Sequence, residues 1–200
     1  MAEHPAVDLS WLERPTPQTY AGVHALVADV AAQGGAVGWL HVPGPDEVRD
    51  WLDGVLAGGV RMVLATSAAE GEAGVVVGCG YWQRLSGAVL RQNAEVRKVM
   101  TGSRDRGRGV ARAVTSALVE DAQAAGVEAL SLDCRGNNHA AIGLYTSLGF
   151  VVTGRRPDWI AVGQERFDQV LLHLDLRARR GSDPEGLVRH GGRREGPGSS

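Results

Sequence analysis

The glycine loop, residues 104–109, constrains the fold more than any other feature, because it joins a β-rich run to an amphipathic helix. It lies within the segment SRDRGRGVARAV and contains Gly107 and Gly109. Apolar residues then recur at helical spacing, at Val110, Val114, Leu118, Ala122 and Ala125. A strand, a glycine loop and a helix in that order present backbone N–H groups and a positive helix end to an anion. The segment predicts a cradle for a small anion, and a tight turn into a packed helix is the alternative.

Hydrophobic patterning along the rest of the chain predicts a mixed α/β domain. We expect strands over residues 7–13, 60–66, 73–85, 89–101, 127–134, 150–154 and 166–176. We expect helices over residues 16–33, 44–59, 107–125 and 138–147. The resulting order, βααβββαβαββ, predicts one sheet with an antiparallel meander and with helices on its faces.

Arginine and glycine clusters carry less information in this chain than in most. Glycine accounts for 28 of the 200 residues, and Lys98 is the only lysine among 21 basic residues. This bias is typical of a GC-rich coding genome, so a solvated face is the alternative for any arginine cluster.

The segment from Arg177 onward contains six glycines, two prolines and six arginines, and it has almost no apolar residues that could order the chain. We therefore expect a folded domain over residues 1–176 and a disordered tail over residues 177–200.

Charge and hydropathy argue against several classes of partner. The formal net charge is −2, and the tail has six arginines against three acidic residues, which leaves −5 on residues 1–176. An acidic body disfavours nucleic-acid binding, and no apolar run reaches the roughly 18 residues of a membrane span. The two cysteines, Cys79 and Cys134, have no metal-ligand spacing and form no disulfide framework. With no apolar leader, we expect a cytoplasmic protein with no metal, nucleic-acid or membrane partner.

A second segment, NNHAAIGLYTSLGF at residues 137–150, adds a pattern of its own. Its residues follow the order N-x-x-A-x-x-L-Y-x-x-x-G-F, given by Asn138, Ala141, Leu144, Tyr145, Gly149 and Phe150. Together with the glycine loop, this pattern resembles the GNAT superfamily of acyl-CoA-dependent N-acyltransferases. The resemblance covers residues 60–176 well and residues 7–59 loosely. Within the superfamily, the chain is most similar to the tabtoxin-resistance type of small-molecule acetyltransferases.

The resemblance implies a GNAT fold, with a mixed, mostly antiparallel sheet, helices on both faces and a V-shaped split between the fourth and fifth strands. Acetyl-CoA would lie in that split as co-substrate, with its pantetheine arm on main-chain groups of Val99, Met100 and Thr101. The resemblance implies that its pyrophosphate binds the amides of Gly107, Arg108, Gly109, Val110 and Ala111, with Arg104 and Arg106 at the rim. The apolar alternation breaks in the fourth strand, which predicts a bulge near Lys98 and Val99.

The reaction implied is direct attack of an amine on the thioester. An amine with a pKa of about 10 is mostly protonated at neutral pH, so a base must take a proton. Glu95 is the candidate base, and a salt-bridged strand residue is the alternative. Tyr145 is the candidate acid for the departing thiolate, and an aromatic core residue is the alternative. Asn138 would bind the pantetheine arm or cap its helix.

The acceptor pocket is less well defined by the sequence. Three aromatic residues are expected to wall it, with plain core packing as the alternative: Tyr81, Trp82 and Trp159. We expect an N-acetyltransferase that acts on a small-molecule amine, in antibiotic or toxin resistance or in natural-product tailoring. A protein or peptide N-acetyltransferase and a non-catalytic acyl-CoA-binding module are the alternatives. The resemblance also implies a homodimer as one assembly, because family members are often dimers.

Overall fold

The structure is a computed structural model that describes residues 7–34, 38–67 and 74–177. The strands of these residues are β1 (Val7–Trp11), β2 (Arg61–Ser67), β3 (Val75–Arg84), β4 (Asn93–Thr101), β5 (Ala129–Arg135), β6 (Val151–Val162) and β7 (Glu165–Asp175). The helices are α1 (Pro17–Ala32), α2 (Pro45–Ala57), α3 (Val110–Ala124) and α4 (His139–Ser147), with a 3-10 turn, η1, at Ser103–Asp105. Their order confirms the predicted order of strands and helices.

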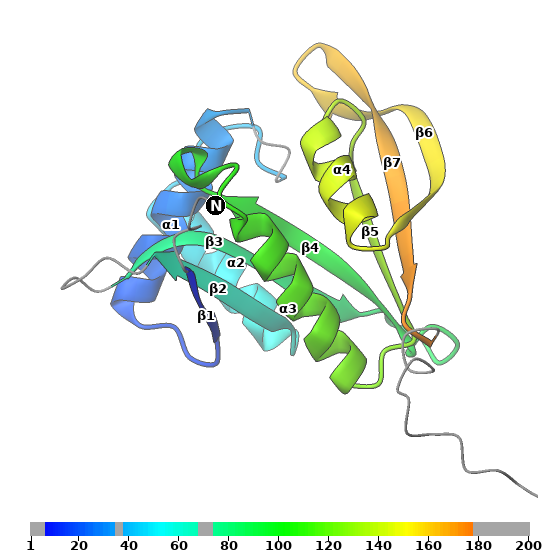
Figure 1. Cartoon of the computed structure of the whole chain (residues 1–200). Helices are drawn as coiled ribbons and strands as arrows, with labels where there is room; N and C mark the ends of the chain where they lie inside the picture. The colour runs from blue at the N-terminus through cyan, green and yellow to red at the C-terminus, as the bar shows by residue number, and fades with distance from the viewer. Residues whose placement is uncertain (1–6, 35–37, 68–73, 178–200) are drawn as a thin grey trace, which may run out of the picture.

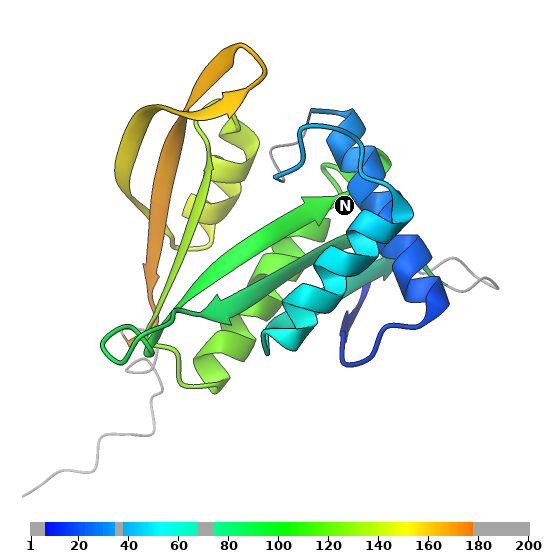
Figure 2. The same cartoon turned by 180° about the vertical axis from the view of Figure 1, so that it is seen from behind.

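The strands form one sheet in the order β1-β2-β3-β4-β5-β7-β6. Only the β4–β5 pair is parallel among the described strands, and the other neighbours are antiparallel. Figures 1 and 2 show α1 and α2 on one face of the β1–β4 half, and α3 on the other face. Helix α4 lies beside the β5–β7 half, on the same side as α3. This arrangement confirms the expected mixed sheet with helices on both faces.

Each face of the sheet has its own hydrophobic core. The core under α3 and α4 includes Val114, Leu118, Leu130, Phe150 and Leu172. The core under α1 and α2 includes Val27, Leu52, Met62, Cys79 and Met100. Strand β4 contributes to both cores, so a change in its register would disturb both faces at once.

The helix starts follow from local capping chemistry. Thr16 and Thr19 form a capping box at the start of α1, in which each side chain accepts the other residue's backbone N–H at 3.2 Å. Helix α2 begins at Pro45, which has no N–H to leave unpaired at that position. Asn138 caps α4, because its side chain accepts a hydrogen bond from the amide of Ala141 at 3.2 Å.

Helix α3 packs against β3 closely because two positions of that strand have no side chain. A Cβ atom on Gly78 would lie 2.5 Å from Cγ1 of Val110. A Cβ atom on Gly80 would lie 3.0 Å from Val114 and 3.1 Å from Leu118. This close approach fixes where α3 begins relative to the sheet, and so where the glycine loop lies.

Strand β6 is longer than the sequence predicts. The prediction ended at residue 154, whereas the strand runs to Val162 with register shifts after Val152 and after Arg156. Asp158 has a φ of 52°, which marks a local break in the strand. Pro157 is tolerated there because β6 is an edge strand with a neighbour on one side only.

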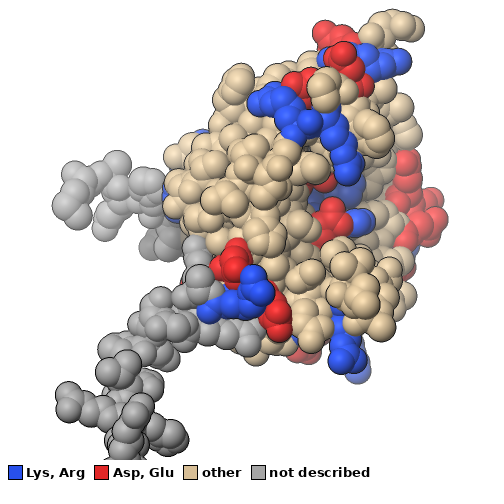
Figure 3. Space-filling view, turned by 90° about the vertical axis from the view of Figure 1, so that its right-hand side faces the viewer, with Lys and Arg blue, Asp and Glu red and all other residues tan. Residues whose placement is uncertain are grey.

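The edge of the molecule formed by β6 and β7 carries charges of both signs. Arg155 pairs with Asp168 at 2.9 Å, and Arg177 pairs with Asp175 at 2.8 Å. On the face shown in Figure 3, acidic and basic side chains lie next to one another.

Within the described ranges, no helix combines the length and the apolar character that crossing a bilayer requires. The tail predicted over residues 177–200 lies outside the described residues except for Arg177.

Replacing Leu118 by alanine is expected to lower the free energy of unfolding by about 3 kcal/mol. Leu118 is fully buried between α3 and the sheet, so its removal leaves a cavity as well as lost apolar burial. Val89 is 91% exposed, and the control Val89→Ala should change stability by less than about 0.5 kcal/mol. Urea unfolding of both variants checks this, and equal midpoints would contradict it.

Candidate active site

Strands β4 and β5 pair over a short stretch and then separate. Their parallel ladder contains Asn93↔Ala129, Ala94↔Leu130 and Glu95↔Ser131, whereas β4 continues to Thr101. Figures 1 and 2 show the two strands diverging from this common end. Beyond Glu95, no described strand pairs with this edge of β4, so its main-chain groups are available to a ligand. The expected V-shaped split is thus present.

A cavity of about 750 Å³, the main cavity, occupies this split. It is lined from α1, β3, β4, β5 and α4, so segments far apart in the chain converge on it. Seven residues predicted for the site line it: Tyr81, Glu95, Val99, Thr101, Arg106, Asn138 and Tyr145.

Strand β4 has a bulge where one was predicted. Cys79 is opposite Met100 and Tyr81 is opposite Arg97, so Lys98 and Val99 together face Gly80. Lys98 has a φ of 53°, as expected of a strained bulge position. The bulge changes the side-chain alternation, so that Val99 packs toward α3 while Met100 packs toward α1 and α2.

The glycine loop connects the end of β4 to α3. Gly107 has a φ of 76° and Gly109 a φ of 84°, conformations that favour glycine. A Cβ atom on Gly107 would meet no described atom within 4 Å. Helix α3 begins at Val110 rather than at residue 107, and no described side chain caps its first turn. Its first amides, including that of Ala111, therefore have no acceptor within the helix.

The arginines of the loop differ in their positions. Arg106 lines the main cavity, whereas Arg108 turns back to Asp105, with 3.1 Å between Nη1 and Oδ1. Arg104 belongs to η1, just before the loop's glycines. The structure thus brings one of the three arginine side chains into the cavity lining.

Tyr145 is an aromatic core residue that also lines the main cavity, and its role as acid stays a prediction. It is 8% exposed, and its ring contacts Phe150 edge-on at 5.8 Å. Burial raises the pKa of its hydroxyl well above the usual value, and Cys134 and Asp133 add smaller contributions. The hydroxyl is therefore protonated at neutral pH and can donate a hydrogen bond into the main cavity.

Glu95 forms the salt bridge of its alternative interpretation, and its role as base stays a prediction. It lines the main cavity, and its Oε2 accepts a hydrogen bond from Nε of Arg97 at 2.8 Å. The second bond from Arg97 goes to the same oxygen. The Glu95 hydrogen bond raises the pKa of the Arg97 guanidinium, so this pair holds both charges at the cavity wall.

Of the three aromatic residues predicted for the acceptor pocket, the structure brings only Tyr81 to the main cavity. Tyr81 is 4% exposed, and burial raises its pKa. Trp82 faces the other side of the sheet, where its Nε1 donates to Asp121 at 2.8 Å. Trp159 is 63% exposed on β6, with Arg156 at 5.0 Å from its ring centroid.

A second cavity of about 650 Å³, the side cavity, adjoins the main cavity on the α2 side. The two share Gly38, Tyr81, Arg97 and Lys98. Trp39 and Trp51 meet edge-on there at 5.2 Å, and Nζ of Lys98 lies 4.4 Å from the Trp39 ring centroid. Burial lowers the pKa of Lys98. The sequence analysis did not assign Trp39, Trp51 or Lys98 to the site, although Lys98 stands out as the only lysine of the chain.

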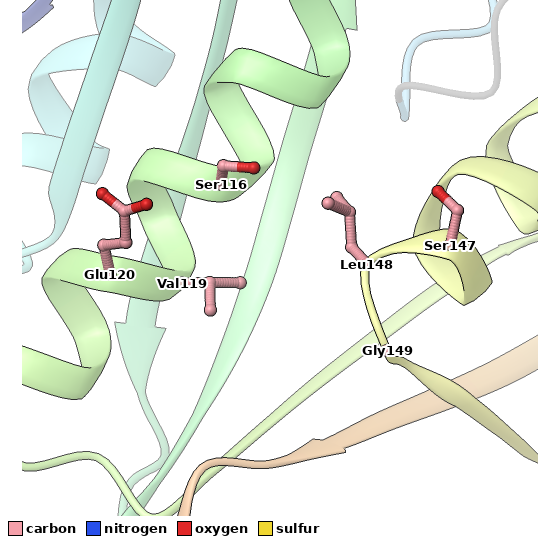
Figure 4. Close-up of a pocket in the computed structure, with 6 residues that line it drawn as sticks. All are labelled: Ser116, Val119, Glu120, Ser147, Leu148 and Gly149. Atoms are coloured by element: carbon pink, nitrogen blue, oxygen red, sulfur yellow. The ribbon is translucent and has the colours of Figure 1, made fainter. Parts of the chain in front are cut away.

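A third hollow of about 350 Å³, the α3–α4 groove, lies between α3 and the end of α4 (Figure 4). Ser116, Val119 and Glu120 line one wall, and 147–149 line the other. None of the predicted site residues lines this groove. Its one acidic group, Glu120, has no acidic or basic partner among the lining residues, so the groove offers no acid and base pair.

Comparison with known proteins identifies relatives of this chain. Residues 32–150 match the model of the acetyltransferase (GNAT) family. An L-methionine sulfoximine/L-methionine sulfone acetyltransferase from Pseudomonas paraeruginosa (strain DSM 24068 / PA7) is 31% identical over 165 residues, which are 78% of this chain and 92% of the relative. A protein of the same name from Pseudomonas aeruginosa matches with the same identity and coverage.

Solved structures share the fold at low sequence identity. A putative acetyltransferase from Salmonella typhimurium, solved with acetyl-CoA, superposes with a TM-score of 0.69 at 22% identity, over 86% of this chain and 94% of that one. A phosphinothricin acetyltransferase from Sinorhizobium meliloti, in complex with acetyl-CoA, has a TM-score of 0.69 at 18% identity, over 84% of this chain and 88% of that one.

Proposed function

The chain belongs to the GNAT acetyltransferase family, and on that premise we propose that it transfers the acetyl group of acetyl-CoA to the amine of a small amino-acid-like molecule within the split between β4 and β5. The observation that carries the proposal is the main cavity. It brings a buried tyrosine hydroxyl, a carboxylate and an open strand edge together next to the glycine loop.

Two buried polar atoms in the main cavity support a polar ligand there. Oγ1 of Thr101 and Nε of Arg135 are buried without a hydrogen-bond partner in the part of the chain that the structure describes. Both residues line the main cavity. Because an unsatisfied buried polar atom costs about 1–3 kcal/mol, a ligand that bonds to them would recover that free energy.

In this proposal, the glycine loop and β4 hold acetyl-CoA. The pyrophosphate would bind the amides of residues 107–111, where positive φ angles and a helix start combine, with Arg104 and Arg106 at its rim. Main-chain groups of residues 99–101 would bind the pantetheine arm. Asn138 lines the same cavity while its Oδ1 caps α4, so its amide nitrogen is the atom we assign to the arm.

The proposed reaction is a direct transfer. The amine nitrogen attacks the thioester carbonyl, a C–N bond forms, and the C–S bond breaks with the electron pair leaving on sulfur. Glu95 takes the amine proton, directly or through water. We assign this role to Oε1, because both bonds from Arg97 go to Oε2.

Tyr145 would face the sulfur as it leaves. A tyrosine hydroxyl is a weaker acid than a thiol, whose ordinary pKa is about 8.5, and burial raises the pKa of Tyr145 further. Complete proton transfer from Tyr145 to the thiolate is therefore uphill. Its contribution is a hydrogen bond to the developing negative charge, which is strong in a site that excludes water.

The acceptor would enter from the side cavity. Glu47 and Asp50 of α2 line it and attract a cationic amine, while Arg97 and Lys98 attract a carboxylate. Trp39 adds an apolar surface to the same cavity. The named relatives act on methionine sulfoximine and methionine sulfone, which carry both an amine and a carboxylate. We therefore propose a zwitterionic acceptor and a role in resistance to such compounds.

The proposed function is tested by measuring thiol release from acetyl-CoA with L-methionine sulfone, L-methionine sulfoximine and phosphinothricin, and by mass spectrometry of the products. The matched control acceptor is the decarboxylated analogue of methionine sulfone, which keeps the amine. We expect an N-acetylated product from the zwitterions and a kcat/KM lower by about tenfold or more for the control. A protein that binds acetyl-CoA without transfer to any of them, or that prefers peptide N-termini, would contradict this proposal.

A further inference from the structure

The last turns of α1 are bonded to the start of the loop region that follows β4. Oδ2 of Asp29 accepts a hydrogen bond from the backbone N–H of Ser103 at 2.6 Å, and Oδ1 accepts one from the Ser103 hydroxyl at 2.8 Å. Ser103 begins η1, directly before the glycine loop. One side chain of α1 thus holds this segment by two bonds.

The same end of α1 is also bonded to the far side of the split. The carbonyl oxygen of Gly34, just beyond the helix, accepts a hydrogen bond from Nη2 of Arg135 at 3.1 Å. Arg135 ends β5, and its guanidinium carbon lies 4.7 Å from the Phe167 ring centroid on β7. Between these two attachments, Val30 and Gln33 line the main cavity. The end of α1 therefore bridges the open ends of β4 and β5.

From these contacts we propose that Asp29 is a positioning residue for acetyl-CoA, which fixes the glycine loop against α1 in the orientation that the pyrophosphate requires. This inference rests on the proposed function, because it assumes that the glycine loop binds acetyl-CoA. Asp29 is not part of the glycine-loop motif, because it lies 74 residues before Ser103 in the chain.

Because Asp29 is negatively charged, the sign of the affinity change on its removal distinguishes a positioning role from a purely electrostatic effect. The Ser103 amide and hydroxyl hold the pKa of this carboxyl below its ordinary value, and Arg106 and Arg104 contribute further. Asp29 is therefore a carboxylate at neutral pH, close to the groups that would bind a diphosphate. By Coulomb's law alone, its removal would strengthen anion binding. A positioning role predicts the opposite, that removing Asp29 weakens the binding of acetyl-CoA.

The test compares Asp29→Ala, Asp29→Asn and Ser103→Ala in the full-length chain, by steady-state kinetics and calorimetric titration with acetyl-CoA. Asp29→Ala loses both hydrogen bonds, and we expect KM and Kd for acetyl-CoA to rise about tenfold, with kcat within about twofold. Asparagine can still accept from the Ser103 amide and donate to its hydroxyl, so Asp29→Asn should stay within about threefold of the wild type. Ser103→Ala loses one bond and should lie between the two.

Tyr20→Phe is the matched control on the same helix. It removes a hydrogen bond from Tyr20 to Asp53 of α2 at 2.5 Å, on a part of α1 that does not line the main cavity. We expect its KM for acetyl-CoA to equal that of the wild type. If Asp29→Ala does not fold, the Kd values of the other two variants test the inference. We then expect a higher Kd for acetyl-CoA in Ser103→Ala than in Asp29→Asn, and the reverse order would overturn it.

The outcomes separate this inference from the proposed function. Wild-type affinity in Asp29→Ala and Ser103→Ala, or tighter binding in both aspartate variants, would overturn the positioning role and leave the proposed function standing. A wild-type protein that binds no acetyl-CoA would overturn both.

Discussion

The Tyr145→Phe enzyme is expected to have a kcat about 100-fold lower than the wild type, which corresponds to about 2.7 kcal/mol of lost transition-state stabilisation. In the proposed mechanism, the hydroxyl stabilises charge that develops on sulfur as the C–S bond breaks, so its loss should affect the chemical step. The ring of Tyr145 packs against Phe150, and phenylalanine keeps that contact. KM for acetyl-CoA should therefore change by less than about threefold.

Steady-state kinetics with saturating acceptor measures this effect. Tyr20→Phe is the control, because it removes a tyrosine hydroxyl that hydrogen-bonds to Asp53 away from the main cavity. Its kcat should match that of the wild type. An unchanged kcat in Tyr145→Phe would show that the leaving sulfur does not depend on this hydroxyl, and it would remove Tyr145 from the mechanism.

The Gly107→Val variant is expected to bind acetyl-CoA about 100-fold more weakly. Gly107 has a φ of 76°, so a β-branched residue there is strained. Its Cβ would also project into the open space beside the loop, where we propose that the pyrophosphate approaches the backbone. Strain and obstruction therefore act together on the same loop. Calorimetric titration with acetyl-CoA measures the change.

Gly163→Val is the control that imposes backbone strain without obstructing the proposed pyrophosphate site. Gly163 has a φ of 57° and open space around its Cβ position, but it lies in the turn between β6 and β7, away from the main cavity. We expect this control to lose stability by about 1–2 kcal/mol while it keeps its affinity for acetyl-CoA. Equal losses of affinity in the two variants would mean that Gly107 acts only through stability.

The order of helices and strands could be predicted from the sequence because it depends on local patterns. Helical periodicity, Pro45 near a helix start and Gly149 after a helix end are all readable along the chain. The bulge at Lys98 was also predictable, because the apolar alternation of β4 breaks there. The length of β6 was not, because Pro157 is a strand breaker unless the strand lies at an edge, and edge position is a property of the whole sheet.

The residues of the acceptor pocket could not be predicted from the alternation of side chains along a strand. Tyr81 and Trp82 are neighbours in β3, and neighbouring side chains of a strand point to opposite faces. They could not both line one pocket, and the structure places Tyr81 at the main cavity and Trp82 under α3. Alternation alone could not decide between them, because both faces of this half of the sheet are covered by helices.

The residues that sequence reasoning missed depend on contacts between distant parts of the chain. Gly34 and Arg135 are 101 residues apart, and Trp39 meets Lys98 only after α1 and α2 pack on the sheet. No short motif contains such pairs. The positive φ angles of the two loop glycines, in contrast, depend on a turn of a few residues, which a local motif can indicate.

A crystal structure of the protein with coenzyme A tests the central claim most directly. We expect the diphosphate to lie on the amides of residues 107–111, the pantetheine arm to follow β4 through the split, and the sulfur to lie within hydrogen-bond distance of the Tyr145 hydroxyl. Coenzyme A bound in the α3–α4 groove instead, or with its sulfur far from Tyr145, would contradict it.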